Sequence, residues 1–331
     1  MFRCLYYHAK KKTPPPINSD NQDLSALKNK AIVENGVMKF RDKEHFNEFL
    51  NLSFDELVSL EKTYGYISYD TKIDQVLDEL DLVATKSEFK SFKKKYQNYM
   101  TTRIRENEES YECIVPPNSY SLIANENGLY YIGDTACRVV GEYLISSSVK
   151  NVSKLLKLEY DDLVNQSNSL DFKTKKYIKI HDLNNSLKST KSYLGGDLNA
   201  SATNPANDRR VFLRAYAFTD QVAGGHRYIV NLYAWGQKKS WLVGWRDYKT
   251  SIYMYGADPG TDVDWYTTYW GNSSWYMFNY QASNTKTLIV QLFNQIVMMS
   301  GDGDPIYFTK VKLKAHTGGT TPATYAEINA Q

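Results

Sequence analysis

Three aspartates and four large aromatic residues lie close together in the last third of the chain. The segment contains Asp258, Asp262 and Asp264, followed by Trp265, Tyr266, Tyr269 and Trp270. Turn-forming residues on both sides predict a long surface loop from Asp258 to Asn272. Exposed rings stack on flat ligands such as sugars, and protein partners use the same rings as anchors. We therefore expect ligand binding by Trp265, Tyr266, Tyr269 and Trp270, with Asp262 and Asp264 as a polar rim.

The same residues are compatible with two other interpretations. Two carboxylates beside an aromatic platform have the composition of a glycoside hydrolase site, with one acid and one base or nucleophile. Alternatively, the aspartates hydrogen-bond their own backbone and the rings pack in the core. All six tryptophans fall within the 41 positions from Trp235 to Trp275. Trp241 and Trp245 share parity with Val243, so on a strand they would face the core together.

No motif in the sequence identifies a reaction. The five histidines are scattered, and the sequence contains no H-E-x-x-H pair, no G-x-S-x-G elbow and no phosphate-binding glycine loop. The three cysteines have no C-x-x-C spacing, which argues against a zinc site; a Cys113–Cys137 bridge is conceivable, but buried thiols are favoured. The sequence thus favours a non-enzymatic protein and predicts no catalytic residue, metal or cofactor.

Charge and hydropathy exclude two classes of partner. Forty basic and 37 acidic residues leave a net charge of +3, too small for the field that nucleic-acid binding requires. The longest apolar stretch, Thr287 to Met299, is too short and too often interrupted by polar residues to span a bilayer. The first residues include no apolar segment typical of a signal peptide, so no export signal is visible.

The N-terminal part of the chain predicts a tether followed by a helical unit. Residues 1–36 are rich in Lys and Pro and read as a flexible tether, and residues 37–200 as a helical unit with a β-hairpin. Ser53 with Glu56, and Thr85 with Glu88, have the spacing of capping boxes at helix starts. Two strands, 120–124 and 129–132, are expected around a turn that ends at Gly128.

The C-terminal part, residues 201–331, predicts an antiparallel β-sandwich. Seven runs rich in β-branched and aromatic residues are separated by Gly, Asn, Asp and Pro. In the last run Val311, Leu313 and Ala315 alternate with three lysines, which predicts one face in the core and the other in water. The fold class is therefore α+β: a helical unit followed by a sandwich.

Two segments carry a family resemblance. The stretch MKFRDKEHFNEFLNLSFDELVSLEKTYGYISY from Met38 to Tyr69, with its element Gly65, Tyr66 and Ser68, resembles the opening of an uncharacterised family of secreted lipoproteins of Bacteroidetes, a domain of unknown function. The segment NENGLYYIGDTACR from Asn125 to Arg138 is similar to the hairpin of that family. The likeness covers residues 37–145 and, more loosely, the β-rich remainder. It implies a protein of the cell envelope or the extracellular space and carries no activity with it.

These observations lead to one functional expectation and two alternatives. We expect a non-enzymatic binding or adhesion protein of the cell envelope that takes a glycan or a surface protein through the aromatic segment. The first alternative is a glycan-acting hydrolase that uses the nearby aspartates. The second is a structural partner in a surface assembly, with the N-terminal helical face as its contact.

Overall fold

The computed structural model describes two units, each with its own core. It describes residues 32–105, 107–114, 119–141, 143–165, 173–176, 196–222, 225–256, 262–267, 269–276, 279–298, 305–320 and 324–331. One unit comprises the described residues between 19 and 179 together with Trp241–Trp245, and the other those of 180–240 and 246–331. Residues 1–31 of the expected tether lie outside the described part.

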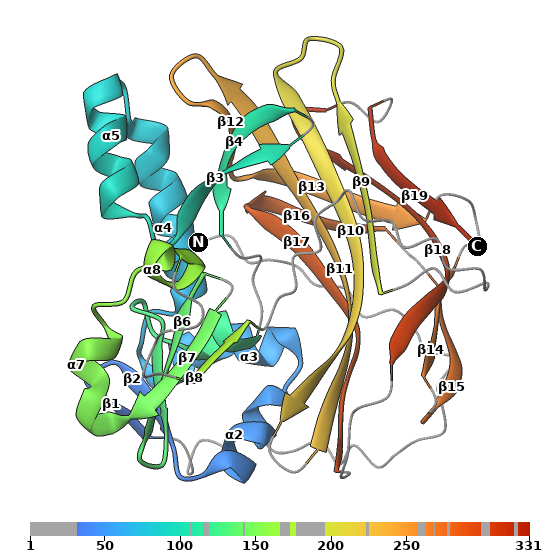
Figure 1. Cartoon of the computed structure of the whole chain (residues 1–331). Helices are drawn as coiled ribbons and strands as arrows, with labels where there is room; N and C mark the ends of the chain where they lie inside the picture. The colour runs from blue at the N-terminus through green and yellow to red at the C-terminus, as the bar shows by residue number, and fades with distance from the viewer. Residues whose placement is uncertain are drawn as a thin grey trace. The chain divides into compact units, whose positions relative to one another are not determined.

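The first unit combines helices with short strands (Figure 1). Its helices are α2 (Lys43–Leu50), α3 (Phe54–Tyr64), α4 (Tyr69–Leu82), α5 (Lys86–Lys95), α6 (Ser119–Ile123), α7 (Val152–Leu155) and α8 (Tyr160–Asn165), with a 3₁₀ turn at Val149–Asn151. Its sheet runs in the order β1 (Ile32–Glu34), β2 (Val37–Phe40), β5 (Leu129–Ile132), β6 (Thr135–Val140), β7 (Tyr143–Ser148) and β8 (Lys173–Lys176). Strands β3 (Met100–Arg105) and β4 (Glu108–Cys113) form an antiparallel hairpin that is not part of this sheet.

The expected helix starts are confirmed. Ser53 accepts from the amide of Glu56, whose carboxylate accepts from the amide of Ser53, so two orphan donors of α3 are satisfied reciprocally. Thr85 and Glu88 do the same at the start of α5. Helix α3 ends at Gly65, whose φ of 68° is a left-handed conformation that glycine adopts without a Cβ clash.

One predicted strand is a helix. Residues 119–123 form α6, so the hairpin of this region pairs β5 with β6 instead of residues 120–124 with β5. The side chain of Tyr66 donates a 2.6 Å hydrogen bond to the carbonyl of Leu122. No disulfide joins Cys113 to Cys137, so the conceivable bridge does not form. Burial raises the pKa of the Cys137 thiol to about 12.

The second unit is a β-sandwich, and the α+β class is confirmed. One sheet contains β9 (Asp197–Thr203), β10 (Arg209–Val222), β11 (Gly225–Ser240) and β17 (Thr287–Met298), with β12 (Gly244–Asp247) further along it. The other, called here the β18 sheet, runs in the order β15 (Gly271–Tyr276), β14 (Asp262–Thr267), β18 (Ile306–Thr317), β13 (Thr250–Gly256) and β16 (Tyr280–Thr285), with β19 (Ala326–Ala330) on β18. Figure 1 shows the long strands β10 and β11 side by side.

Alternating side chains fill the space between these sheets. Strand β10 contributes Val211, Leu213 and Ala215, and β18 contributes Val311 and Leu313, all fully buried. The alternation expected for β18 is therefore confirmed, with its lysines on the face opposite the core. The predicted boundary near residue 200 falls inside β9, which pairs with β10 from Asp197 to Thr203.

Candidate functional site

The aspartate-rich segment is mainly a strand and not a long loop. Residues 262–267 form β14, which pairs with β15 on one side and with β18 on the other. The expectation of a loop from Asp258 to Asn272 is therefore wrong over Asp262–Thr267 and Gly271–Asn272. Asp258 and the side chain of Asp262 lie outside the described residues. A strand sends successive side chains to opposite faces, so the neighbouring rings separate.

Trp265 belongs to the core. It is 3% exposed, and its ring lies 5.9 Å from that of Phe293 within the sandwich. Val263 and Thr267, two residues to either side, are buried on the same face. The pleat thus directs Trp265 between the sheets, where no ligand from solvent reaches it, and its assignment to a surface patch is wrong.

Trp270 and Tyr269 lie at the β14–β15 turn. The Trp270 ring meets Phe293 and Tyr228 edge to face, at 5.0 and 5.2 Å between centroids, and is partly buried against the core. Tyr269 covers it at 4.7 Å and is 56% exposed. Of the four predicted rings, Tyr269 is therefore the exposed one.

Tyr266 lies on the opposite face of β14 from Trp265. Its ring stacks on Tyr307 of β18, with centroids 5.3 Å apart and an angle of 26° between the planes. Asp264 shares parity with Tyr266 and is paired across the strands with Lys310. One carboxylate oxygen of Asp264 is buried and has no hydrogen-bond partner among the described residues. The structure thus keeps Asp264 and Tyr266 together and separates both from Trp265.

The outer face of the β18 sheet gathers further aromatic and basic side chains. We call it the tyrosine–lysine face; β13 and β14 contribute one side and β18 the central row. Its members are Tyr253, Tyr255, Asp264, Tyr266, Tyr307, Lys310, Lys312, Lys314 and His316. All nine are partly buried, and the strand residues that alternate with the tyrosines of β13, Ile252 and Met254, are in the core.

His316 lies at one end of this face. Its imidazole stacks on Tyr253 at 4.6 Å with 12° between the planes, and meets Tyr255 edge to face at 5.7 Å. Burial lowers the pKa of His316, because the charged form loses hydration. Its Nδ1 atom is buried and has no hydrogen-bond partner in the described part of the chain. A neutral ring that stacks on Tyr253 and meets Tyr255 edge to face is the expected form at pH 7.

Charged neighbours surround the middle of the face. The ammonium of Lys314 lies 4.4 Å from the ring centre of Tyr325 and 3.8 Å from the carboxylate of Glu327 on β19. Burial acts to lower the pKa of Lys314, but Tyr325 and Glu327 stabilise its charge and the net direction is upward. Lys312 pairs across the strands with Asn329, and no ion pair to it is found among the described carboxylates.

The residues that sequence analysis missed are Tyr253, Tyr255, Tyr307 and His316. A signal for the two tyrosines on β13 existed, because they alternate with Ile252 and Met254 as on a half-buried strand. That β13 and β14 both flank β18 was not visible in the sequence. Strand pairing brings Tyr255 opposite Lys314, and Tyr253 opposite His316, more than 50 positions along the chain.

The two tryptophans at the β11–β12 turn likewise differ in burial. Trp245 is 1% exposed and its indole donates to Glu108, whereas Trp241 is 83% exposed. Parity with Val243 therefore indicates burial correctly for Trp245 and wrongly for Trp241, because residues 241–243 form a turn and not a strand.

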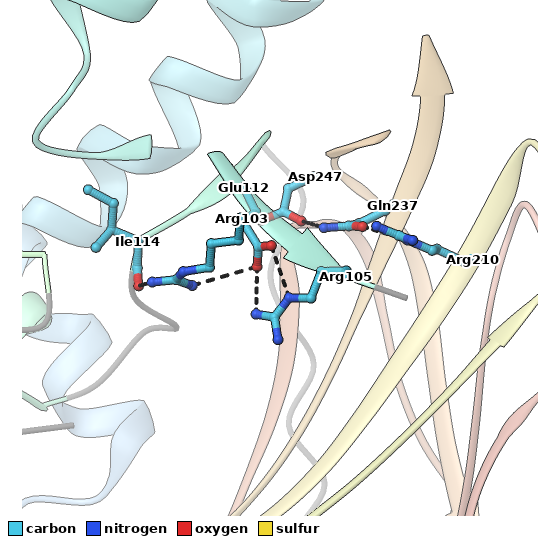
Figure 2. Close-up of polar contacts among 7 residues, drawn as sticks. All are labelled: Arg103, Arg105, Glu112, Ile114, Arg210, Gln237 and Asp247. Carbon is cyan, nitrogen blue, oxygen red and sulfur yellow. Dashed lines mark hydrogen bonds and ion pairs between the residues drawn. The ribbon is translucent and has the colours of Figure 1, made fainter. Parts of the chain in front are cut away.

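Two other polar clusters are each held by contacts within one unit (Figure 2). In the β3–β4 hairpin the buried Glu112 accepts from Arg105 at 3.0 and 2.8 Å, and Arg103 lies at 3.6 Å. In the sandwich, Arg210 donates to Gln237 at 2.7 Å and Gln237 donates to Asp247 at 2.8 Å. Charge-assisted hydrogen bonds of this kind fix side chains in place, so we assign both clusters a structural role.

No group of three or more His, Cys, Asp or Glu side chains suited to a metal ion occurs within the described ranges. Those ranges also contain no helix with the length and apolar character needed to cross a bilayer.

Comparison with known proteins adds one structural neighbour. No family model matches the chain, and no curated protein matches it. Among solved structures, a DUF4848 family protein from Bacteroides thetaiotaomicron is 16% identical, covering 90% of this chain and 100% of that one with a TM-score of 0.27. A TM-score this low does not establish a shared fold. The neighbour is an uncharacterised protein of the Bacteroidetes, the group named by the resemblance; the secreted lipoprotein character stays a prediction.

Proposed function

We propose that the protein is a non-enzymatic binding protein whose β-sandwich takes a glycan on the tyrosine–lysine face. One observation carries the proposal: strand alternation places four tyrosines and a histidine on one sheet face, outside the core. Tyrosine offers an apolar ring for stacking and a hydroxyl for hydrogen bonding at low cost in side-chain entropy. The apolar faces of sugar rings would stack there, with their hydroxyls bonded by Asp264 and the lysines.

Two stacked groups define where the ligand would lie. Tyr266 with Tyr307 stands at one end of β18, and Tyr253 with His316 at the other. Tyr307 and His316 are nine positions apart on the strand, a span of roughly 30 Å at about 3.3 Å per residue. An extended chain of several sugar rings, laid along β18, would meet both groups. A row of ring and lysine side chains along one strand favours binding within a polymer over binding of a single sugar.

Affinity measurements on the full chain test this proposal. We expect Tyr266→Ala and Tyr253→Ala each to weaken binding in a polysaccharide panel about fivefold to tenfold, which corresponds to roughly 1 to 1.4 kcal/mol. Tyr269→Ala is the matched control, because it removes an exposed tyrosine in the turn after β14 and not on the tyrosine–lysine face. Loss of binding in Tyr269→Ala alone would instead place the ligand at the β14–β15 turn, and absence of glycan binding throughout would refute the proposal.

The hydrolase alternative rests on Asp264, whose buried carboxylate oxygen has no partner among the described residues. A glycoside hydrolase needs a second carboxylate about 5 to 9.5 Å away. Release of reducing ends from the polysaccharide panel, abolished by Asp264→Asn, would establish hydrolysis and overturn the non-enzymatic proposal. Retention of binding in Asp264→Asn with no reducing ends in any sample is the result we expect.

Placement at the cell envelope is supported by the resemblance over residues 37–145. We propose that the protein works there as a binding or adhesion protein, where glycans and surface proteins are available as partners. Protease treatment of intact cells of the source bacterium tests the location. Digestion of the protein before cell lysis is expected, and full protection until lysis would contradict it.

A further inference from the structure

The row of lysines on β18 points to the charge of the ligand. Lys310, Lys312 and Lys314 lie on one face at steps of two residues, roughly 7 Å apart along the strand. Like charges at this spacing repel each other unless anions lie between them. The three lysines therefore call for compensating negative charge on the same face.

Two of the three lysines have an acidic neighbour within the sheet. Lys314 lies 3.8 Å from Glu327, and Lys310 is paired across the strands with Asp264. Lys312, between them, is paired across the strands with Asn329, an uncharged residue, and has no ion pair with a described carboxylate. The middle of the row thus carries uncompensated positive charge.

Resting on the function proposed above, we infer that the glycan bound along β18 is acidic and places a carboxylate or sulfate group at Lys312. The stacked rings at the two ends would hold sugar rings, and the lysine row between them would receive the anionic substituents. Uronic-acid polymers and sulfated polysaccharides share this chemistry. A neutral glycan would leave the charge of Lys312 uncompensated and would gain stacking only.

Matched pairs of polymers test the inference with the full chain. Polygalacturonate is compared with its methyl ester, and dextran sulfate with dextran, by affinity electrophoresis and titration calorimetry. We expect the acidic member of at least one pair to bind at least tenfold more tightly than its neutral form. Raising the salt from 50 to 500 mM should weaken the acidic complex, because salt screens exposed charges, and should leave neutral binding nearly unchanged. The preferred pair distinguishes carboxylate from sulfate recognition.

Two variants assign the effect to the site. Lys312→Gln should lower affinity for the acidic polymer about fivefold to tenfold and leave the neutral polymer unaffected. Lys90→Gln, an exposed lysine on α5, is the matched control and should change neither. Equal losses in both variants would show general electrostatic attraction and overturn the inference. Equal binding of acidic and neutral polymers would overturn the inference and leave the proposed function standing, whereas binding of neither would overturn both.

Discussion

Replacing Trp265 separates a core role from a ligand-binding role. Trp265 is 3% exposed and packs among Phe293 and the core of the sandwich, whereas Tyr266, the next residue, lies on the outer face. Trp265→Ala should therefore destabilise the sandwich, and Tyr266→Ala should leave it nearly unchanged. The pair tests the alternation of β14 directly, because a shift of one residue would exchange the two results.

The expected loss of unfolding free energy in Trp265→Ala follows from the burial of this side chain. Truncation of a buried Trp to Ala costs about 3 to 5 kcal/mol, since it removes apolar contacts and leaves a cavity. The indole Nε1 of Trp265 is buried without a hydrogen-bond partner among the described residues, and a buried unmade bond costs about 1 to 3 kcal/mol. Trp265→Phe removes this donor and keeps most of the packing, so we expect its unfolding free energy to lie within about 1 kcal/mol of that of the natural chain.

Urea unfolding followed by far-ultraviolet circular dichroism measures these differences. The midpoint should fall strongly for Trp265→Ala, with the slope retained, and little for Trp265→Phe and Tyr266→Ala. Hydrogen exchange of the β18 amides locates the loss within the sandwich unit. A change below about 1 kcal/mol in Trp265→Ala would refute the core assignment, and an equal loss in Tyr266→Ala would refute the alternation.

Two further predictions concern stability. Gly128 has a φ of 80°, and a Cβ there would lie 2.1 Å from the carbonyl oxygen of Val139, so Gly128→Ala should cost about 2 to 4 kcal/mol of unfolding free energy. Gly36→Ala is the control, because Gly36 has a similar φ but no atom near its Cβ; an equal loss in both variants would contradict the clash. The second prediction concerns the effect of pH on His316. Burial places the pKa of His316 in the folded protein below its pKa in the unfolded chain, so between these two pKa values the unfolded chain binds more protons. Its contribution to stability is present above the unfolded pKa, about 6.5, and is lost as the pH falls toward the folded pKa. The drop in urea midpoint between pH 7.5 and 5.0 should be smaller in His316→Phe, and an unchanged drop would show that His316 is not responsible.

Local rules predicted the parts of the fold that depend on few residues. The capping boxes at Ser53 and Thr85 were predicted because a side chain and an amide three residues apart suffice to form them. The outward lysines of β18 were predicted because alternation is a property of one strand. The prediction of a strand where α6 lies was wrong, because a short apolar run such as Tyr120 to Ile123 fits a buried strand and a buried helix equally well.

The candidate site required information that no single segment contains. Turn residues near Asp258 and Gly271 suggested a loop, although Val263, Trp265 and Thr267 already had the alternation of a strand buried on one face. Once β14 is recognised, parity alone separates Trp265 from Tyr266. Tyr307 and His316 join the site because β14 and β13 both pair with β18, one at each end of it. This pairing connects positions that are far apart in the sequence.

The division of aromatic residues between the two faces of the β18 sheet bears on function as well as stability. A tryptophan in the core contributes by burial, and its removal changes folding before it changes binding. Tyrosines on the outer face contribute little to folding, so the stacking of Tyr266 on Tyr307 and of Tyr253 on His316 calls for another explanation. Ligand binding supplies one, because stacking and charge recognition both require side chains held in place by the sheet and open on one side. Variants of the outer face that fold normally are therefore the decisive ones.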